Sequence, residues 1–139
     1  MISCTRKLEF DSAHRILNHE SKCRTLHGHR YTVEVTVTSE GLDSLGRVVD
    51  FSEIKKIIGG WLDLNFDHNT ILHTDDHLVK VLFDDKMAMK VPYIMKVNPT
   101  AENMADHLFE IFKDELFAKG MILKKIRVYE TPNCYAQRD

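Results

Sequence analysis

The most regular pattern in the chain is the alternation of apolar and polar residues from Tyr31 to Thr38. Side chains of a β-strand point alternately to opposite faces, so this period of two predicts a strand with one buried and one polar face. Residues 39–47 have the glycine-rich, polar composition that is typical of a turn. The apolar residues that follow predict a short return strand over residues 48–51.

A weaker alternation in residues 4–14 predicts another strand earlier in the chain. Alternate residues from Cys4 to Phe10 share one largely apolar face, on which Arg6 is the exception. The same spacing continues to His14, so we expect this imidazole to point to the buried face at the end of the strand. A polar loop then connects the two strands.

Two segments instead repeat their apolar residues with the spacing of an amphipathic helix. The first begins at Asp50, which with Glu53 resembles a capping box, and a pair of adjacent glycines weakens it. The second begins after Thr100, the predicted N-cap, and ends at Gly120. Their apolar stripes comprise Ile54, Ile57, Ile58, Trp61 and Leu62 in the first helix and Ala101, Met104, Ala105, Leu108, Ile111, Phe112 and Leu116 in the second.

Three shorter segments complete the expected order of elements. Residues 75–85 predict a short helix, residues 92–97 a short strand, and residues 122–130 the last strand. The order is β-β-(β)-α-β-α-β, which indicates an α+β fold with a mainly antiparallel sheet. A length of 139 residues is typical of a single domain, which we expect to span residues 1–139.

The composition excludes several classes of function. The formal net charge of −2 gives no electrostatic footprint for nucleic acid or for an anionic membrane. The first ten residues contain no apolar core of a secretory signal, and no apolar run reaches the roughly 18 residues that span a bilayer. Three cysteines are an odd count without a disulfide framework, so a reducing cytoplasm is the expected location.

Three histidines are expected at one end of the sheet. His27 and His29 share the face of Tyr31 if that strand begins early enough, and His14 ends the preceding strand. If the two strands pair as a hairpin, the end of one meets the start of the other. Three neutral imidazoles leave a fourth position open, as in catalytic zinc sites, where the metal acts as a Lewis acid. Taken singly, each of these histidines could equally be a hydrogen-bonded or surface residue.

Two further groups have the chemistry of acid–base catalysis. Cys23 lies four residues before His27, and beside a metal its thiolate could act as a base or nucleophile. Its alternative role is that of a small buried apolar residue. Asp67 and His68 follow the first helix and could relay protons if their loop returns to the metal. Otherwise they belong to a solvated loop, and as neighbours in extended chain they would point apart.

The apolar face of the last strand ends in Glu130, with Lys124 the exception on that face. A buried carboxylate needs a partner, and no single lysine or arginine is its evident mate. A flat donor edge such as that of a guanidine-like heterocycle would satisfy it. Alternatively, Glu130 is exposed beyond the end of the strand. The remaining histidines are expected in polar loops or on helix surfaces, and these are His19, His73, His77 and His107.

Five short motifs, taken together, resemble a known family. They are "FDSAH", "CRTLHGHRY", "DHNTIL", "NPTAEN" and "YETP", and they follow one another between Phe10 and Ala136. This combination and order resemble the 6-pyruvoyltetrahydropterin synthase superfamily over nearly the whole chain.

The resemblance implies a fold and an assembly. The fold would be the tunnelling fold, an antiparallel sheet with two helices on one face. Its subunits join their sheets into a β-barrel as trimers, and two trimers stack into a homo-hexamer with active sites at the subunit interfaces. An interfacial site would explain why Glu130 finds no partner in its own chain.

The resemblance also implies roles for individual residues. His14, His27 and His29 would bind Zn2+, and Cys23 would be the proton acceptor. His68 with Asp67 would form the relay, and Glu130 would anchor the pterin ring. Glu102 would be a possible substrate contact, although a glutamate in the first turn of a helix also compensates the helix dipole.

Within the superfamily, the spacing is similar to the bacterial branch. Three residues separate Cys23 from His27, as in the 6-carboxytetrahydropterin synthases of queuosine biosynthesis, and the ending "YETPNCYA" resembles the same branch. The implied activity is a carbon–carbon lyase that converts 7,8-dihydroneopterin triphosphate to 6-carboxy-5,6,7,8-tetrahydropterin, acetaldehyde and triphosphate. The alternatives are 6-pyruvoyltetrahydropterin formation and a non-catalytic pterin- or metal-binding protein. Residues 73–97 are longer than in compact members, which could alter specificity or the subunit contact.

Overall fold

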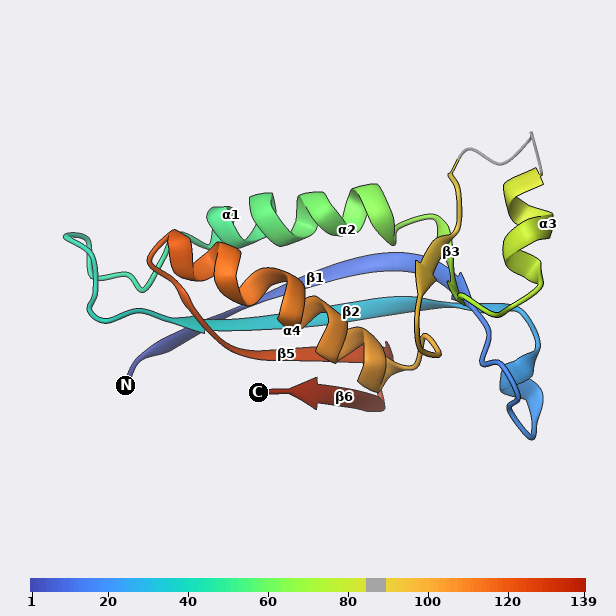
Figure 1. Ribbon diagram of the computed structural model, residues 1–139. Helices are drawn as coiled ribbons and strands as arrows, with labels where there is room; N and C mark the ends of the chain where they lie inside the picture. The colour runs from blue at the N-terminus through green and yellow to red at the C-terminus, as the bar shows by residue number, and fades with distance from the viewer. Residues whose placement is uncertain (85–89) are drawn as a thin grey trace.

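A six-stranded sheet runs through the computed structural model, which describes residues 1–84 and 90–139 (Figure 1). The strand order is β4-β3-β1-β2-β5-β6, so the two longest strands, β1 and β2, lie in the middle. The strands are β1 (Ser3–His14), β2 (His27–Thr38), β3 (Asn69–His73), β4 (Tyr93–Met95), β5 (Ile122–Thr131) and β6 (Cys134–Arg138).

The sheet is mixed. β1 with β2, β2 with β5, and β5 with β6 are antiparallel pairs, whereas β3 runs parallel to both β1 and β4. The expected mainly antiparallel sheet is confirmed for β1, β2 and β5, whereas the β3–β4 edge is parallel. The antiparallel strand β6 was not among the predicted strands. β3 itself was not predicted, because only Ile71 and Leu72 of its five residues are buried apolar side chains.

The expected helices are present, with one local irregularity. α1 (Phe51–Ile54), a π-helical turn over Lys55–Gly59 and α2 (Gly60–Asn65) form a continuous helical segment. α3 (Leu78–Asp84) and α4 (Ala101–Ala118) follow, and a 3₁₀ turn, η1, spans Lys22–Arg24. The predicted helix over residues 75–85 thus corresponds to α3, and its last residue lies outside the described residues.

Side-chain caps determine where two of these helices begin. The Asp50 carboxylate accepts a hydrogen bond from the Ser52 backbone N–H over 2.8 Å, and Thr100 caps α4 in the same way through the Asn103 N–H at 3.1 Å. The predicted return strand over residues 48–51 is wrong, because Asp50 starts a helix and Phe51 is already its first residue.

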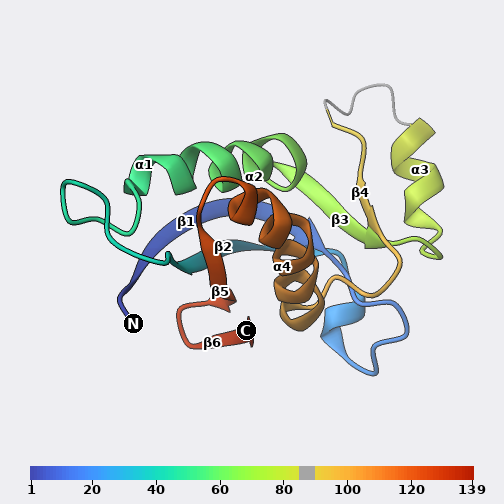
Figure 2. The ribbon, with the colours of Figure 1, turned by 60° about the vertical axis from the view of Figure 1, so that its left-hand side comes forward.

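The core lies between one face of the sheet and the helices. Tyr31, Val33, Val35 and Val37 of β2 are fully buried, and they share a single apolar cluster with side chains of α1, α2 and α4. Figure 2 shows the helical segment α1–α2 and helix α4 beside one another over the sheet. No helix within the described residues is both long and apolar enough to traverse a membrane.

A β-bulge in β5 sets which residues of that strand face the core. Thr36 pairs with Lys125 but Val37 pairs with Leu123, so Lys124 is an extra residue. The bulge explains why Lys124 interrupts the apolar alternation. It also corrects the expected parity, because Leu123 is buried at this end of the strand whereas Ile122 is only partly buried.

Candidate metal centre

Strand pairing brings three histidines together at one end of the sheet. In the β1–β2 ladder His14 lies opposite His27, and Ser12 lies opposite His29. β2 begins at His27, so His27 and His29 point to the same face as Tyr31. Each histidine offers a ring nitrogen, and these nitrogens lie within 4.8 Å of one another.

Backbone carbonyls orient two of the rings. His14 donates from Nδ1 to the carbonyl of Pro99 over 2.7 Å, and His27 donates from Nδ1 to the carbonyl of Thr25 over 2.6 Å. In neutral rings these bonds leave both Nε2 atoms without a proton, and the two atoms face each other at 3.2 Å. Two lone pairs at that distance repel unless a cation binds them, and carbonyl partners of this kind commonly orient metal-binding histidines.

The third imidazole, that of His29, also has a ring nitrogen that lacks a partner in the described part of the chain. His29 Nε2 is buried and has no hydrogen-bond partner among residues 1–84 and 90–139. A buried polar atom without a partner costs free energy that a bound ion would recover. The donor set of three imidazole nitrogens therefore fits a metal such as zinc, with room for a fourth ligand.

Burial keeps the imidazoles of His14 and His29 in the neutral form that binds metals. His14 is only 1% exposed, and burial lowers its pKa to about 4, helped by the neighbouring His27 and His29 and opposed by the hydrogen bond to Pro99. Burial also lowers the pKa of His29, against the opposing effect of Glu130. Both rings are thus neutral near pH 7, as metal ligation requires.

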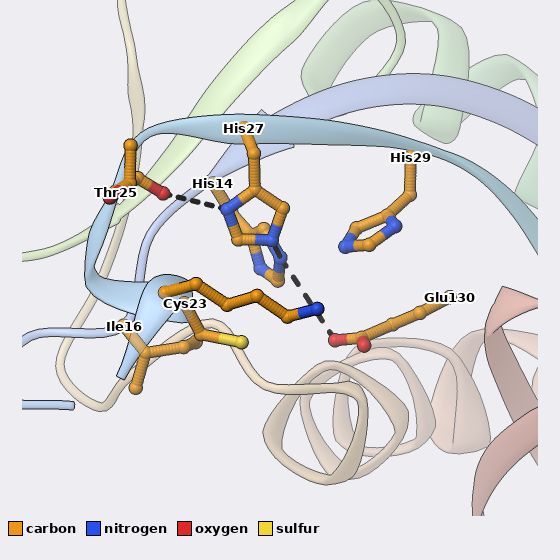
Figure 3. A pocket seen from close by; sticks show the side chains of 8 residues that line it. His14, Ile16, Cys23, Thr25, His27, His29 and Glu130 are labelled. Atoms are coloured by element: carbon orange, nitrogen blue, oxygen red, sulfur yellow. Dashed lines mark hydrogen bonds and ion pairs between the residues drawn. The ribbon is translucent and has the colours of Figure 1, made fainter. Parts of the chain in front are cut away.

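A cavity of about 480 Å³ opens beside the three rings. Figure 3 shows the Cys23 sulfur and the Glu130 carboxylate pointing toward the imidazoles from different elements. Cys23 belongs to η1 and is half-buried, whereas Glu130 lies near the end of β5. The lining residues are His14, Ile16, Lys22, Cys23, Thr25, His27, His29 and Glu130.

Glu130 occupies an intermediate environment. Its side chain is 31% exposed, and its Oε1 lies 4.0 Å from His14 Nε2. No lysine or arginine in the described ranges lies within 4.0 Å of its carboxylate. Glu130 is therefore neither a surface residue beyond the strand nor part of an internal ion pair with a basic side chain of those ranges. Its carboxylate remains available to accept hydrogen bonds from a ligand.

Asp67 and His68 lie apart from this cavity. Asp67 Oδ1 accepts the backbone N–H of Asp11 over 2.9 Å, and the His68 backbone N–H donates to the Asp11 carbonyl. Both residues therefore lie beside β1, on the side opposite β2. The two side chains do pair, at 3.8 Å between Asp67 Oδ2 and His68 Nε2, because His68 has a φ of 53° and the chain is not extended there. The imidazole is 77% exposed.

The other predicted contact is also distant from the cavity. Glu102 is exposed in the first turn of α4 and does not line the cavity. Of the histidines expected to be peripheral, His73 lies in β3 rather than in a loop. His107 lies on α4, as expected, but its side chain is half-buried and its Nε2 lies 2.6 Å from the Tyr93 hydroxyl.

Sequence reasoning assigned no definite role to four contributors to the site. Ile16, Lys22 and Thr25 line the cavity, and Pro99 supplies the carbonyl that orients His14. Lys22 and Thr25 are near neighbours of Cys23, and that proximity was the available signal. Nothing in a side chain indicates that the carbonyl of Pro99 lies beside His14.

Comparison with known proteins identifies close relatives. Residues 3–139 match the model of a family described as 6-pyruvoyl tetrahydropterin synthase. A 6-carboxy-5,6,7,8-tetrahydropterin synthase of Rickettsia bellii is 46% identical over 138 residues, which cover 99% of each chain.

Two solved structures share the fold. An uncharacterized protein from Wolinella succinogenes has a TM-score of 0.83 at 23% identity, over 99% of this chain and 97% of that one. The 6-pyruvoyl tetrahydropterin synthase of Caenorhabditis elegans has a TM-score of 0.68 at 24% identity, over 99% and 94% of the two chains.

Proposed function

Because the chain belongs to the 6-pyruvoyl tetrahydropterin synthase family, we propose that it is a lyase acting on 7,8-dihydroneopterin triphosphate. With the consumption of one water molecule, the products would be 6-carboxy-5,6,7,8-tetrahydropterin, acetaldehyde and triphosphate, in a step of queuosine or 7-deazaguanine biosynthesis. The name of the Rickettsia bellii relative supports this choice among pterin reactions. The observation that carries the proposal is the convergence of three imidazoles, a thiol and a carboxylate on one cavity.

Zn2+ would be held by His14, His27 and His29. Its support is the facing pair of Nε2 atoms and the buried, unpartnered Nε2 of His29. When bound, the metal would supply Lewis acidity toward an oxygen of the substrate side chain.

The remaining roles belong to side chains around the cavity. Cys23 would remove a proton from the substrate side chain as its thiolate, since its sulfur points to the space beside the histidines (Figure 3). Glu130 would accept hydrogen bonds from the amino group and ring N–H of the pterin, which form a flat pair of donors. The cavity would hold the reacting carbons between these two groups.

Asp67 and His68 would serve as a proton relay from a neighbouring subunit. Within one chain they lie on the side of β1 opposite β2, immediately before β3, and do not line the cavity. Symmetric assembly can place one subunit's edge beside another subunit's cavity. We therefore propose trimers that close their sheets into a barrel, paired into a homo-hexamer with shared active sites. Each chain would contribute one domain over residues 1–139 and act in the cytoplasm.

The test is to identify the products formed by the zinc-loaded protein from 7,8-dihydroneopterin triphosphate, using mass spectrometry. We expect 6-carboxytetrahydropterin together with acetaldehyde. A 6-pyruvoyl product would contradict the proposed reaction but retain the site assignments. Unchanged substrate, with metal bound and the oligomer intact, would favour a pterin-binding protein without catalysis.

A further inference from the structure

Lys22 is the only lysine or arginine among the cavity-lining residues that the structure describes. It belongs to η1, immediately before Cys23. Glu130 is the one carboxylate among these lining residues, and no ion pair within 4.0 Å joins it to Lys22. The cavity therefore holds one ammonium and one carboxylate that do not neutralise each other directly.

Three other cations around this end of the sheet already have partners. Arg15 forms a two-point ion pair with Asp76, and Arg30 bonds to Asp11 at 2.7 Å and to Glu9 at 2.9 Å. Lys90 donates to two backbone carbonyls at 2.6 Å each. These cations would have to give up those contacts to bind another anion.

Arg24 offers a direct comparison with Lys22. It is exposed on the same 3₁₀ turn, two residues further along, but it does not line the cavity. The short turn therefore presents one of its two cations to the site and keeps the other outside it.

We propose that Lys22 is the residue that recognises the phosphate groups of the substrate. This inference rests on the proposed function, in which the ligand has a pterin ring at one end and a triphosphate at the other. Glu130 binds the ring edge, and the Lys22 ammonium binds the anionic tail. The side-chain carbons that join ring and phosphate then lie beside Cys23 and the histidines, which is where the chemistry is required.

The contact also gives the site a basis for choosing phosphorylated pterins. An uncharged pterin keeps the Glu130 contact but gains nothing from Lys22. Loss of the Lys22 ammonium should therefore weaken binding of the phosphorylated pterin and leave the affinity for the unphosphorylated pterin unchanged.

The experiment compares two fluorescent, fully oxidised analogues, neopterin triphosphate and neopterin, bound to the zinc-loaded protein. In the Lys22→Gln variant we expect about tenfold weaker binding of neopterin triphosphate, the scale of one charged contact, and binding of neopterin within about twofold of the original. The matched control, Arg24→Gln, should leave both affinities unchanged.

Three results would overturn the assignment of Lys22. They are undiminished binding of neopterin triphosphate by Lys22→Gln, equal weakening of both analogues, and an original protein that binds both analogues alike. Product analysis of the original protein separates this inference from the proposed reaction. If the protein forms no product but its binding of neopterin triphosphate depends on Lys22, only the proposed reaction is refuted. If it forms the product but this binding does not depend on Lys22, only the role of Lys22 is refuted.

Discussion

The Nδ1 atom of His14 donates a hydrogen bond to the carbonyl of Pro99, 85 residues further along the chain, over 2.7 Å. Pro99 directly precedes Thr100, the N-cap of α4. The contact therefore joins the start of a core helix to a candidate metal ligand and fixes which nitrogen of that ligand faces the cavity. The position of α4 and the orientation of the His14 ring therefore depend on each other.

Removing one ligand should empty the metal centre. We expect His29→Ala to lower zinc affinity by more than tenfold, since loss of even an outer contact to a ligand commonly costs that much. Zinc content after dialysis against a weak chelator measures the effect. His73→Ala, in β3 and outside the cluster, is the control. Full zinc occupancy in His29→Ala would remove His29 from the metal site.

Removing the thiol should separate binding from catalysis. Cys23→Ala is expected to retain zinc and lose turnover by about 10²–10⁴-fold, the range for loss of a general base. Cys134→Ala, which changes an exposed cysteine far along the chain, should retain activity. If the Cys23→Ala variant turned over substrate at the original rate, the thiol could not be the proton acceptor.

Mixing two inactive variants should restore activity if sites are shared between subunits. Cys23→Ala keeps the relay of Asp67 and His68, and His68→Ala keeps the thiol. A co-refolded equal mixture should recover about a quarter of the original activity, because one site in four then combines two intact halves. The separate variants, assayed at the same concentration, provide the baseline. No recovery of activity in mixed oligomers would indicate that the Cys23 thiol and the relay of each active site come from the same chain.

Two tyrosines should respond in opposite ways to loss of the hydroxyl. The Tyr31 hydroxyl is buried and unpartnered within the described residues, so Tyr31→Phe should leave stability unchanged or raise it by up to about 1 kcal/mol. The Tyr93 hydroxyl bonds to His107, so Tyr93→Phe should lower stability by about 1 kcal/mol. Urea unfolding of the metal-free protein measures both. A clear loss in Tyr31→Phe would reveal a partner for that hydroxyl.

The ion pair of Arg15 with Asp76 should contribute a pH-dependent share of stability. The Asp76 side chain is fully buried, and its hydrogen bond to Arg15 holds the pKa of the carboxyl below its ordinary value. The folded state therefore favours the ionised form, and this stabilisation is present above about pH 4 and lost as pH falls through the depressed pKa.

The variant Asp76→Asn tests this contribution and keeps a side-chain oxygen that can accept the hydrogen bond from the Leu78 backbone N–H. We expect about 2 kcal/mol lower stability at pH 7, with the difference from the original protein narrowing below pH 4. Urea unfolding at several pH values provides the measurement, and Asp75→Asn, an exposed neighbour, is the control. A difference that stayed constant down to pH 2.5 would contradict the assignment.

Much of the candidate site could be predicted because strand parity is a strong constraint. Once residues 27–38 alternate, His27 and His29 must share a face, and hairpin pairing brings His14 opposite His27. The N-caps of α1 and α4 were equally predictable, since Asp50 and Thr100 bond to backbone only two or three residues away.

The features that escaped prediction depend on contacts between distant parts of the chain. The parallel strand β3 has only five residues, and their order shows no apolar alternation. The half-buried position of His107 results from its contact with Tyr93, which one helix pattern alone does not reveal. The separation of Asp67 and His68 from the cavity follows from their bonds to the backbone of Asp11.

The bulge at Lys124 makes the spacing along β5 as important to the site as the identity of its residues. Leu123 faces the core on one side of the extra residue, and Val128 faces it on the other side. Deleting Lys124 would leave every proposed functional group in the chain, but the residues on the two sides of the deletion could no longer both keep their orientation toward the core. If Leu123 kept its place, Glu130 would turn away from the cavity. One residue fewer at this point would therefore either displace Leu123 from the core or turn the Glu130 carboxylate away from the cavity.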